Sequence, residues 1–252
     1  MNYQKLNYSQ YFIDTSNDYN HTGNARFKIE YKDIKYIYKD RLCHANYEVH
    51  YEPERNVIQI NFEETNGKKD WFVNLMFVEK YYDSFISGDK KITLRVHNGW
   101  AAMYKAMKHF VRNEVWELKR RYPTATVEII GWSLGSGQAM LCAQDLNYQY
   151  GIRPHLFTYG SVNPFKTNIF NRHKIRKYLR DCCAEVYNFC DRSDIVTYLP
   201  FRILGFIKIK RVNVKGRFKL LGLFNPWKYH THYDEEDLYS RINRRDKRRN
   251  KK

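Results

Sequence analysis

The chain has 252 residues and a formal net charge of +17. Its composition is 43% hydrophobic and 17% aromatic, which excludes a chain that is disordered throughout, because enough apolar surface is present to form a core. The positive charge favours anionic partners, such as nucleic acid, an acidic substrate or an anionic membrane, but it does not specify a fold.

Short apolar segments and amphipathic helices alternate along the chain. Residues 57–62 (VIQINF) alternate in polarity and predict a strand. Apolar side chains at three- and four-residue intervals predict a helix from residue 100 to 122, ended by Pro123. Four further elements are predicted, namely strands at 125–130, 155–159 and 184–190 and a helix at 134–149. This alternation favours an α/β fold with a mostly parallel central sheet flanked by helices.

The chain contains no repeat and no Pro/Gly/Ser-rich linker, so we expect a single domain over residues 1–240. Residues 241–252 (RINRRDKRRNKK) carry eight basic residues and one aspartate and are predicted to form a disordered basic tail. A tether to a polyanion or a membrane is the alternative for this tail. No signal peptide and no run of 18 apolar residues is visible, so a cytoplasmic or peripheral membrane location is expected.

The cysteines are odd in number and form neither a CxxC motif nor a disulfide framework, so reduced thiols are expected. They are Cys43, Cys142, Cys182, Cys183 and Cys190. His230 and His232 would make at best a weak pair of metal ligands. We therefore expect no metal site and no cofactor.

The most informative segment is the G-x-S-x-G motif from Gly131 to Gly135, with Ser133 at its centre. The motif alone is common by chance, but here a predicted strand precedes it and a predicted helix follows it. That context is typical of a nucleophile elbow, in which a sharp turn projects the serine hydroxyl above the end of a strand. Gly131 and Gly135 would allow the strand and the helix to approach closely. The backbone N–H of Leu134, at the helix N-terminus, would be one oxyanion donor.

A serine nucleophile needs a base and an acid that orients the base, and in this fold they follow in the order Ser, Asp or Glu, His. Asp191 and Asp194 both come directly after the predicted strand 184–190, and His230 and His232 lie further on. The spacing leaves both choices open. Taken singly, each of these residues is more often a turn or surface residue than a catalytic one.

Ordered blocks around the serine resemble the class 3 (fungal-type) lipase family of α/β-hydrolases over roughly residues 55 to 235. The matching blocks are Phe62–Thr65 (FEET), Asp70–Leu75 (DWFVNL), Val96–Trp100 (VHNGW), Gly131–Gly135 (GWSLG), Thr158–Asn163 (TYGSVN), Asp194–Pro200 (DIVTYLP) and His230–Tyr233 (HTHY). The resemblance implies an α/β-hydrolase fold and assigns Asp194 rather than Asp191, and His230 rather than His232, as the partners of Ser133.

The resemblance also assigns Thr65 to the oxyanion hole beside Leu134, and it gives His97 no catalytic role. Glu63 and Glu64 replace the Arg and Gly of the family pattern, which puts the oxyanion loop of this chain in question. Trp132, Ser136 and Thr197 are further departures from the pattern.

Two segments favour a lipid substrate. Residues 70–77 (DWFVNLMF) correspond to the surface lid of the family, with Trp71, Leu75 and Phe77 as its apolar candidates; a helix packed on the core is the alternative. Residues 201–229 alternate apolar and basic residues, which suits an anionic interface. Two edge strands with a lysine-rich outer face are the alternative for that segment.

These features predict a carboxylic ester hydrolase that acts through an acyl-enzyme, with lipid acyl esters or a small ester as substrate and an anionic membrane surface as a candidate partner. The alternative function is a catalytically weak or inactive hydrolase scaffold that binds a membrane or a polyanion. A nucleic-acid partner is not expected, because only the charge, and no binding motif, points to one. The sequence does not specify the oligomeric state.

Overall fold

The structure is a computed structural model, which describes residues 26–31, 35–40, 45–62, 79–87, 90–191, 193–209, 212–214 and 230. Several predicted features lie outside these described residues: Thr65, the lid candidates within residues 70–77, His232 and the basic tail 241–252. Of the segment 201–229, residues 210–211 and 215–229 also lie outside them. Within the described part of the chain, no helix combines the length and the apolar character needed to cross a membrane.

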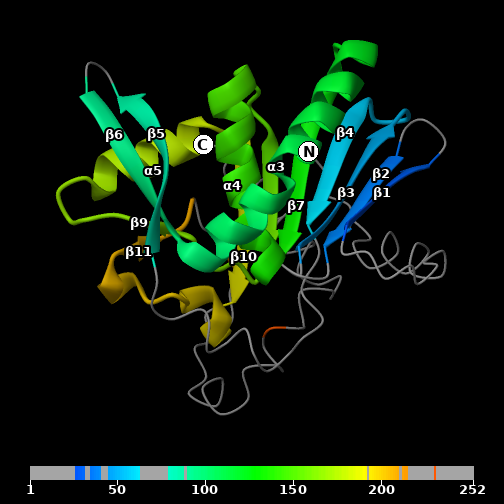
Figure 1. Ribbon diagram of the computed structural model, residues 1–252. Helices are drawn as coiled ribbons and strands as arrows, with labels where there is room; N and C mark the ends of the chain where they lie inside the picture. Colours follow the sequence, from blue (N-terminus) through cyan, green and yellow to red (C-terminus); the bar gives the residue numbers. More distant parts are fainter. Residues whose placement is uncertain are drawn as a thin grey trace, which may run out of the picture.

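An eight-stranded sheet runs through the molecule in the order β1-β2-β3-β4-β7-β8-β10-β12 (Figure 1). Its first four strands are antiparallel and are β1 (Arg26–Tyr31), β2 (Lys35–Asp40), β3 (Ala45–Glu52) and β4 (Val57–Phe62). The others run parallel to β4 and are β7 (Thr126–Trp132), β8 (His155–Tyr159), β10 (Glu185–Asp191) and β12 (Val212–Val214). The predicted parallel sheet is confirmed; the antiparallel extension β1–β3 was not predicted.

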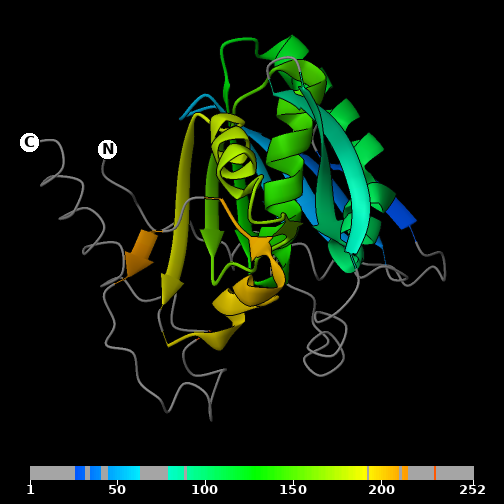
Figure 2. The same ribbon diagram turned by 90° about the vertical axis from the view of Figure 1, so that its left-hand side faces the viewer.

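The helices of the described residues are α3 (Asn98–Arg121), α4 (Leu134–Tyr150) and α5 (Arg172–Asp181). The first two match the predicted helices within two residues at each end. Helix α4 packs on β7 and β8, and α3 packs on β3 and β4, so these two helices lie side by side on one face of the sheet (Figures 1 and 2). Helix α5 returns the chain from β9 to the start of β10 and buries only Ile175 and Leu179.

A second, smaller sheet was not predicted. Its strand order is β11-β9-β6-β5, and all its neighbours are antiparallel. The strands are β5 (Glu79–Ser87), β6 (Lys90–His97), β9 (Phe165–Lys166) and β11 (Phe206–Ile207). Strand β9 lies in the segment that follows β8, and β11 lies in the segment that follows β10. Both segments leave the carboxyl edge of the main sheet, and the pairing of β9 with β11 joins them.

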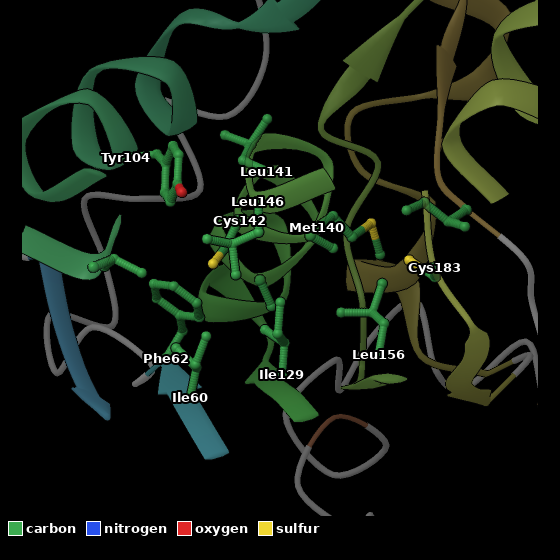
Figure 3. Close-up of a cluster of buried hydrophobic side chains, with 14 of the residues drawn as sticks. Ile60, Phe62, Tyr104, Ile129, Met140, Leu141, Cys142, Leu146, Leu156 and Cys183 are labelled. Atoms are coloured by element: carbon green, nitrogen blue, oxygen red, sulfur yellow. The ribbon is translucent and has the colours of Figure 1, made fainter. Parts of the chain in front are cut away.

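The core lies between the main sheet and α3 and α4. Figure 3 shows side chains of β4, β7 and β8 packing against those of α4, with Tyr104 of α3 at one side. Helix α4 is buried along its first three turns, which its small and apolar residues allow. A buried polar group also joins the helices: Asp145 of α4 accepts hydrogen bonds from Tyr104 Oη at 2.9 Å and Arg112 Nε at 2.8 Å. Helix α4, which begins at the motif serine, is therefore fixed on two sides.

Candidate active site

Ser133 occupies a sharp turn between β7 and α4. Its backbone has φ 50° and ψ −116°, a conformation that L-residues rarely adopt and that requires support from the surroundings. The support includes a hydrogen bond from Ser133 N to the carbonyl of Tyr159, the last residue of β8, at 2.9 Å. The Ser133 side chain is buried, and its Oγ has no hydrogen-bond partner among the described residues. The structure therefore has the strand–turn–helix geometry that the motif predicts.

Gly131 is required by the close approach of β7 to α4. A Cβ atom at this position would lie 2.5 Å from the carbonyl oxygen of Gly135 and 2.7 Å from the Cβ of Ala139. Both distances are well inside van der Waals contact, and the first involves a backbone atom that cannot move away by a change of rotamer. The first glycine of the motif thus brings the helix directly behind the serine, as predicted.

The first turn of α4 is held by two contacts that sequence reasoning missed. The buried indole of Trp100 donates from Nε1 to the carbonyl of Leu134 at 3.0 Å. The indole fits there because Gly137 has no side chain: a Cβ at Gly137 would lie 2.6 Å from Trp100 Cδ1. On the other side, the Ser136 hydroxyl bonds to the carbonyl of Ser133 and accepts from Val162 N at 3.2 Å. The Trp100–Leu134 and Ser136–Val162 contacts join residues that are distant in sequence, so no local pattern reveals them.

The parallel register brings the ends of three strands to one edge of the sheet. Trp132, which precedes Ser133, is the register partner of Tyr159, and Tyr159 is the register partner of Phe189 on β10. Strand β10 continues only to Asp191, and Asp194 follows three residues later. Ser133 and Asp194 therefore both leave the carboxyl edge of the sheet, with β8 between their strands. Figure 2 shows the arrowheads of these strands pointing to the same side.

Asp194 and His230 form a buried pair. His230 Nδ1 lies 2.8 Å from Asp194 Oδ2, and the side chains are 1% and 0% exposed, respectively. The second carboxylate oxygen, Oδ1, accepts from Val196 N at 2.9 Å and so caps the short 3₁₀ helix Ile195–Tyr198. With both oxygens engaged, the carboxylate has a fixed orientation and can hold the imidazole in one plane.

The alternatives for the acid and the base are placed differently. Asp191 uses its Oδ1 to accept from Ser193 N at 2.7 Å, as a turn residue does. The structure thus brings His230 to Asp194. His232 lies outside the described residues.

The candidate oxyanion donors are described only in part. Leu134 is the first residue of α4, so its N–H has no acceptor within the helix and lies at the positive end of the helix dipole. Thr65 falls outside the described residues, so its predicted contribution stays a prediction, as does the influence of Glu63 and Glu64. Trp132 packs its ring against Tyr159, with centroids 6.0 Å apart.

Lys208 is a buried cation beside the loop that carries Asp194. Its Nζ donates to the carbonyl of Ser161 at 2.5 Å and to the carbonyl of Thr197 at 2.6 Å. Asn163 joins the same two segments, because its N donates to Leu199 O at 2.8 Å. The blocks at 158–163 and 194–200, which the sequence analysis identified separately, are therefore bonded to one another. Lys208 was not predicted, since it sits in an alternating apolar and basic segment without a motif.

His97 has a structural position. Its Nδ1 accepts from Gly99 N at 3.1 Å, which caps the N-terminus of α3, and its ring lies edge-on to Trp100 at 4.8 Å. The expectation of a non-catalytic role agrees with this geometry. Cys142, Cys182, Cys183 and Cys190 are all free and buried, and the described residues contain no group of three His, Cys, Asp or Glu side chains that would hold a metal ion.

The fold is that of an α/β-hydrolase. Its features are a mostly parallel sheet with helices packed on it, a strained serine between β7 and α4, and an aspartate after β10 that contacts a histidine. Solved structures agree. The triacylglyceride lipase of Rhizomucor miehei superposes with a TM-score of 0.60 at 22% identity, covering 77% of this chain and 68% of that one. Lipase II from Rhizopus niveus gives 0.61 at 20% identity, covering 79% and 71%.

Sequence comparison gives the family. The model of the family described as "Lipase (class 3)" matches residues 59–204, which is more than half of the chain. A lipase of Rhizomucor miehei is 28% identical over 152 residues, which are 60% of this chain but only 39% of the relative. The protein belongs to the class 3 lipase family, and the predicted resemblance is confirmed.

Proposed function

We propose that the protein is a carboxylic ester hydrolase in which Ser133 is the nucleophile, His230 the general base and Asp194 the residue that orients the base. The observation that carries this proposal is the buried 2.8 Å contact between His230 and Asp194, at the sheet edge where Ser133 sits in its strained turn. One of the similar solved structures, at 22% identity, is a triacylglycerol lipase whose catalytic centre is a serine protease triad. Its similar fold is consistent with a triad at the same edge of the sheet in this protein.

The proposed reaction is acyl transfer. His230 Nε2 takes the proton of the Ser133 hydroxyl while Oγ bonds to the ester carbonyl carbon, and the Leu134 N–H stabilises the oxyanion together with Thr65. The tetrahedral intermediate expels the alcohol, which takes the proton from His230. Water then attacks the acyl-enzyme by the same route and releases the carboxylic acid. Asp194 keeps Nδ1 protonated, so that Nε2 is the nitrogen able to accept a proton, and it stabilises the imidazolium once formed.

We propose lipid acyl esters as the substrate class. The family membership supports this choice, and so do the apolar lid candidates Trp71, Leu75 and Phe77 predicted from the sequence. A small soluble ester is the competing substrate.

The experiment compares p-nitrophenyl esters of short and long acyl chains, with wild type and Ser133→Ala. We expect hydrolysis that favours the longer chains and that falls to the background rate in Ser133→Ala. Activity without chain-length preference would leave an esterase and remove the lipid substrate. Equal activity of both proteins would refute the assignment of Ser133, and a folded wild type without any activity would favour the inactive scaffold.

A further inference from the structure

Three large apolar side chains protrude from two neighbouring loops. Ile169, Phe170 and Ile203 are 85%, 92% and 93% exposed, and Phe201 and Leu204 beside Ile203 are each 42% exposed. We call these five residues the apolar tip. Exposed apolar clusters of this kind on soluble proteins mark surfaces that meet a partner or a membrane, because leaving them in water is unfavourable.

The two loops of the apolar tip are bonded to each other. Thr167 N donates to Gly205 O at 3.0 Å, and Arg172 Nη2 donates to Arg202 O at 3.4 Å. The pairing of β9 with β11 continues the contact. The tip is therefore one surface built from the loops next to β9 and β11, and backbone hydrogen bonds between these loops and strands fix its position.

Three arginines adjoin the apolar tip: Arg172 and Arg176 on the first turns of α5, and Arg202 between Phe201 and Ile203. Arg172 bonds to the carbonyl of Arg202, and Arg176 follows Arg172 by one turn of α5, so the three arginines are neighbours. Burial lowers the pKa of Arg176, and the charges of Arg172 and Arg202 lower it further. Within the part of the chain that the structure describes, none of the three forms an ion pair with a carboxylate. The cluster is thus a local positive charge that is not neutralised by these residues.

One of the two loops of the apolar tip follows β10 and lies near the edge where Ser133 leaves the sheet. Residues 195–204 follow the carboxyl end of β10, and in Figure 2 they lie beyond the arrowheads of the strands.

We propose that the apolar tip and its three arginines dock the protein on an anionic phospholipid surface. Protruding isoleucine and phenylalanine side chains would enter the acyl region, and the arginines would contact anionic headgroups. The positive charge of the three arginines favours an anionic lipid surface over other partners. A second copy of the chain would oppose one arginine cluster with another in a two-fold contact, and nucleic acid offers no apolar phase for Ile169 and Ile203. The proposal is independent of catalysis, because it concerns binding.

The test measures binding of the full chain to vesicles by co-sedimentation, in a Ser133→Ala background so that no lipid is hydrolysed. One vesicle is phosphatidylcholine, and the other contains about a third phosphatidylglycerol. We expect preferential binding to the anionic vesicle. Arg172→Gln with Arg202→Gln should weaken it roughly 30-fold, since each arginine at the surface contributes about a factor of five. Phe170→Ser with Ile203→Ser should weaken it about tenfold or more, through lost apolar insertion.

Matched controls use exposed residues near the C-terminal ends of α3 and α4, outside the apolar tip. Arg120→Gln with Arg121→Gln removes the same charge, and Trp116→Ser with Tyr148→Ser removes aromatic side chains that are 50% and 49% exposed. Both control pairs should bind vesicles within about twofold of the parent.

Three outcomes would overturn the proposal. Undiminished affinity of the tip variants for anionic vesicles would show that the tip does not dock the protein. Equal losses in the control pairs would assign the binding to net charge alone. A dimer in sedimentation that Phe170→Ser dissociates, without vesicle binding, would assign the tip to a second copy. Because the readout requires no hydrolysis, a failure of the proposed catalytic residues would leave the vesicle result standing.

Discussion

Replacing Asp194 by Asn tests the role of the buried Asp–His pair with little change of shape. Asn retains an oxygen that can accept from Val196 N, so the cap of the 3₁₀ helix can persist. Its amide, however, is a hydrogen-bond donor toward His230 Nδ1. That favours the tautomer with the proton on Nε2, which cannot accept the proton of Ser133.

The magnitude follows from the geometry of the pair. A carboxylate 2.8 Å from the imidazole nitrogen stabilises the imidazolium by about 4–6 kcal/mol at an effective dielectric constant of about 20. Losing that stabilisation in the transition state lowers kcat by roughly 10³–10⁴-fold.

The assay is steady-state ester hydrolysis, with Asp191→Asn as the matched control. Asp191 lies three residues away and bonds to Ser193 N rather than to the histidine, so its variant should retain kcat within about tenfold. Circular dichroism checks that both variants are folded. Retention of more than a tenth of the wild-type kcat in Asp194→Asn would contradict the proposed role of Asp194, and so would an equal loss of kcat in Asp191→Asn.

Three further predictions concern the scaffold. Gly131→Ala should lower the free energy of unfolding by about 1–3 kcal/mol and reduce activity. The matched control is Gly99→Ala, whose methyl group would meet only ordinary contacts at 3.4 Å. This control should leave both the denaturation midpoint and the activity unchanged. Lys208→Met should lower the free energy of unfolding by about 2–4 kcal/mol, because two buried carbonyls lose a charged donor; an unchanged urea midpoint would contradict this. Burial raises the pKa of Cys182 to about 11 and that of Cys183 further, so both thiols stay protonated at pH 8, and native alkylation mapped by mass spectrometry should be slow until urea is added.

The strand–turn–helix unit around Ser133 was predictable because its signals are local. An apolar strand, a glycine-framed turn and a helix of small residues follow one another within a single segment, and the structure has them within two residues of the predicted bounds. Helix α5 was missed for the converse reason. Only Ile175 and Leu179 are buried in a segment rich in basic residues, so the apolar periodicity is too sparse to predict a helix.

The contacts that support the site were beyond sequence reasoning because they join distant segments. Trp100 reaches Leu134 only because Gly137 leaves room for the indole, and Lys208 joins two loops that come from different strands. The order of the family blocks predicted the pairing of Asp194 with His230, whose contact the structure shows, but their catalytic roles stay a prediction. It did not predict the second sheet, in which β9 and β11 pair. Those elements are too short, at two residues each, to carry a pattern.

Labelling with a fluorophosphonate probe, followed by peptide mass spectrometry, tests the central claim most directly, because the probe reacts only with a serine that its surroundings activate. We predict a single modified residue, Ser133, with labelling lost in Ser133→Ala and strongly slowed in Asp194→Asn. A folded wild-type protein that never labels, or labelling that persists on another serine in Ser133→Ala, would contradict the account.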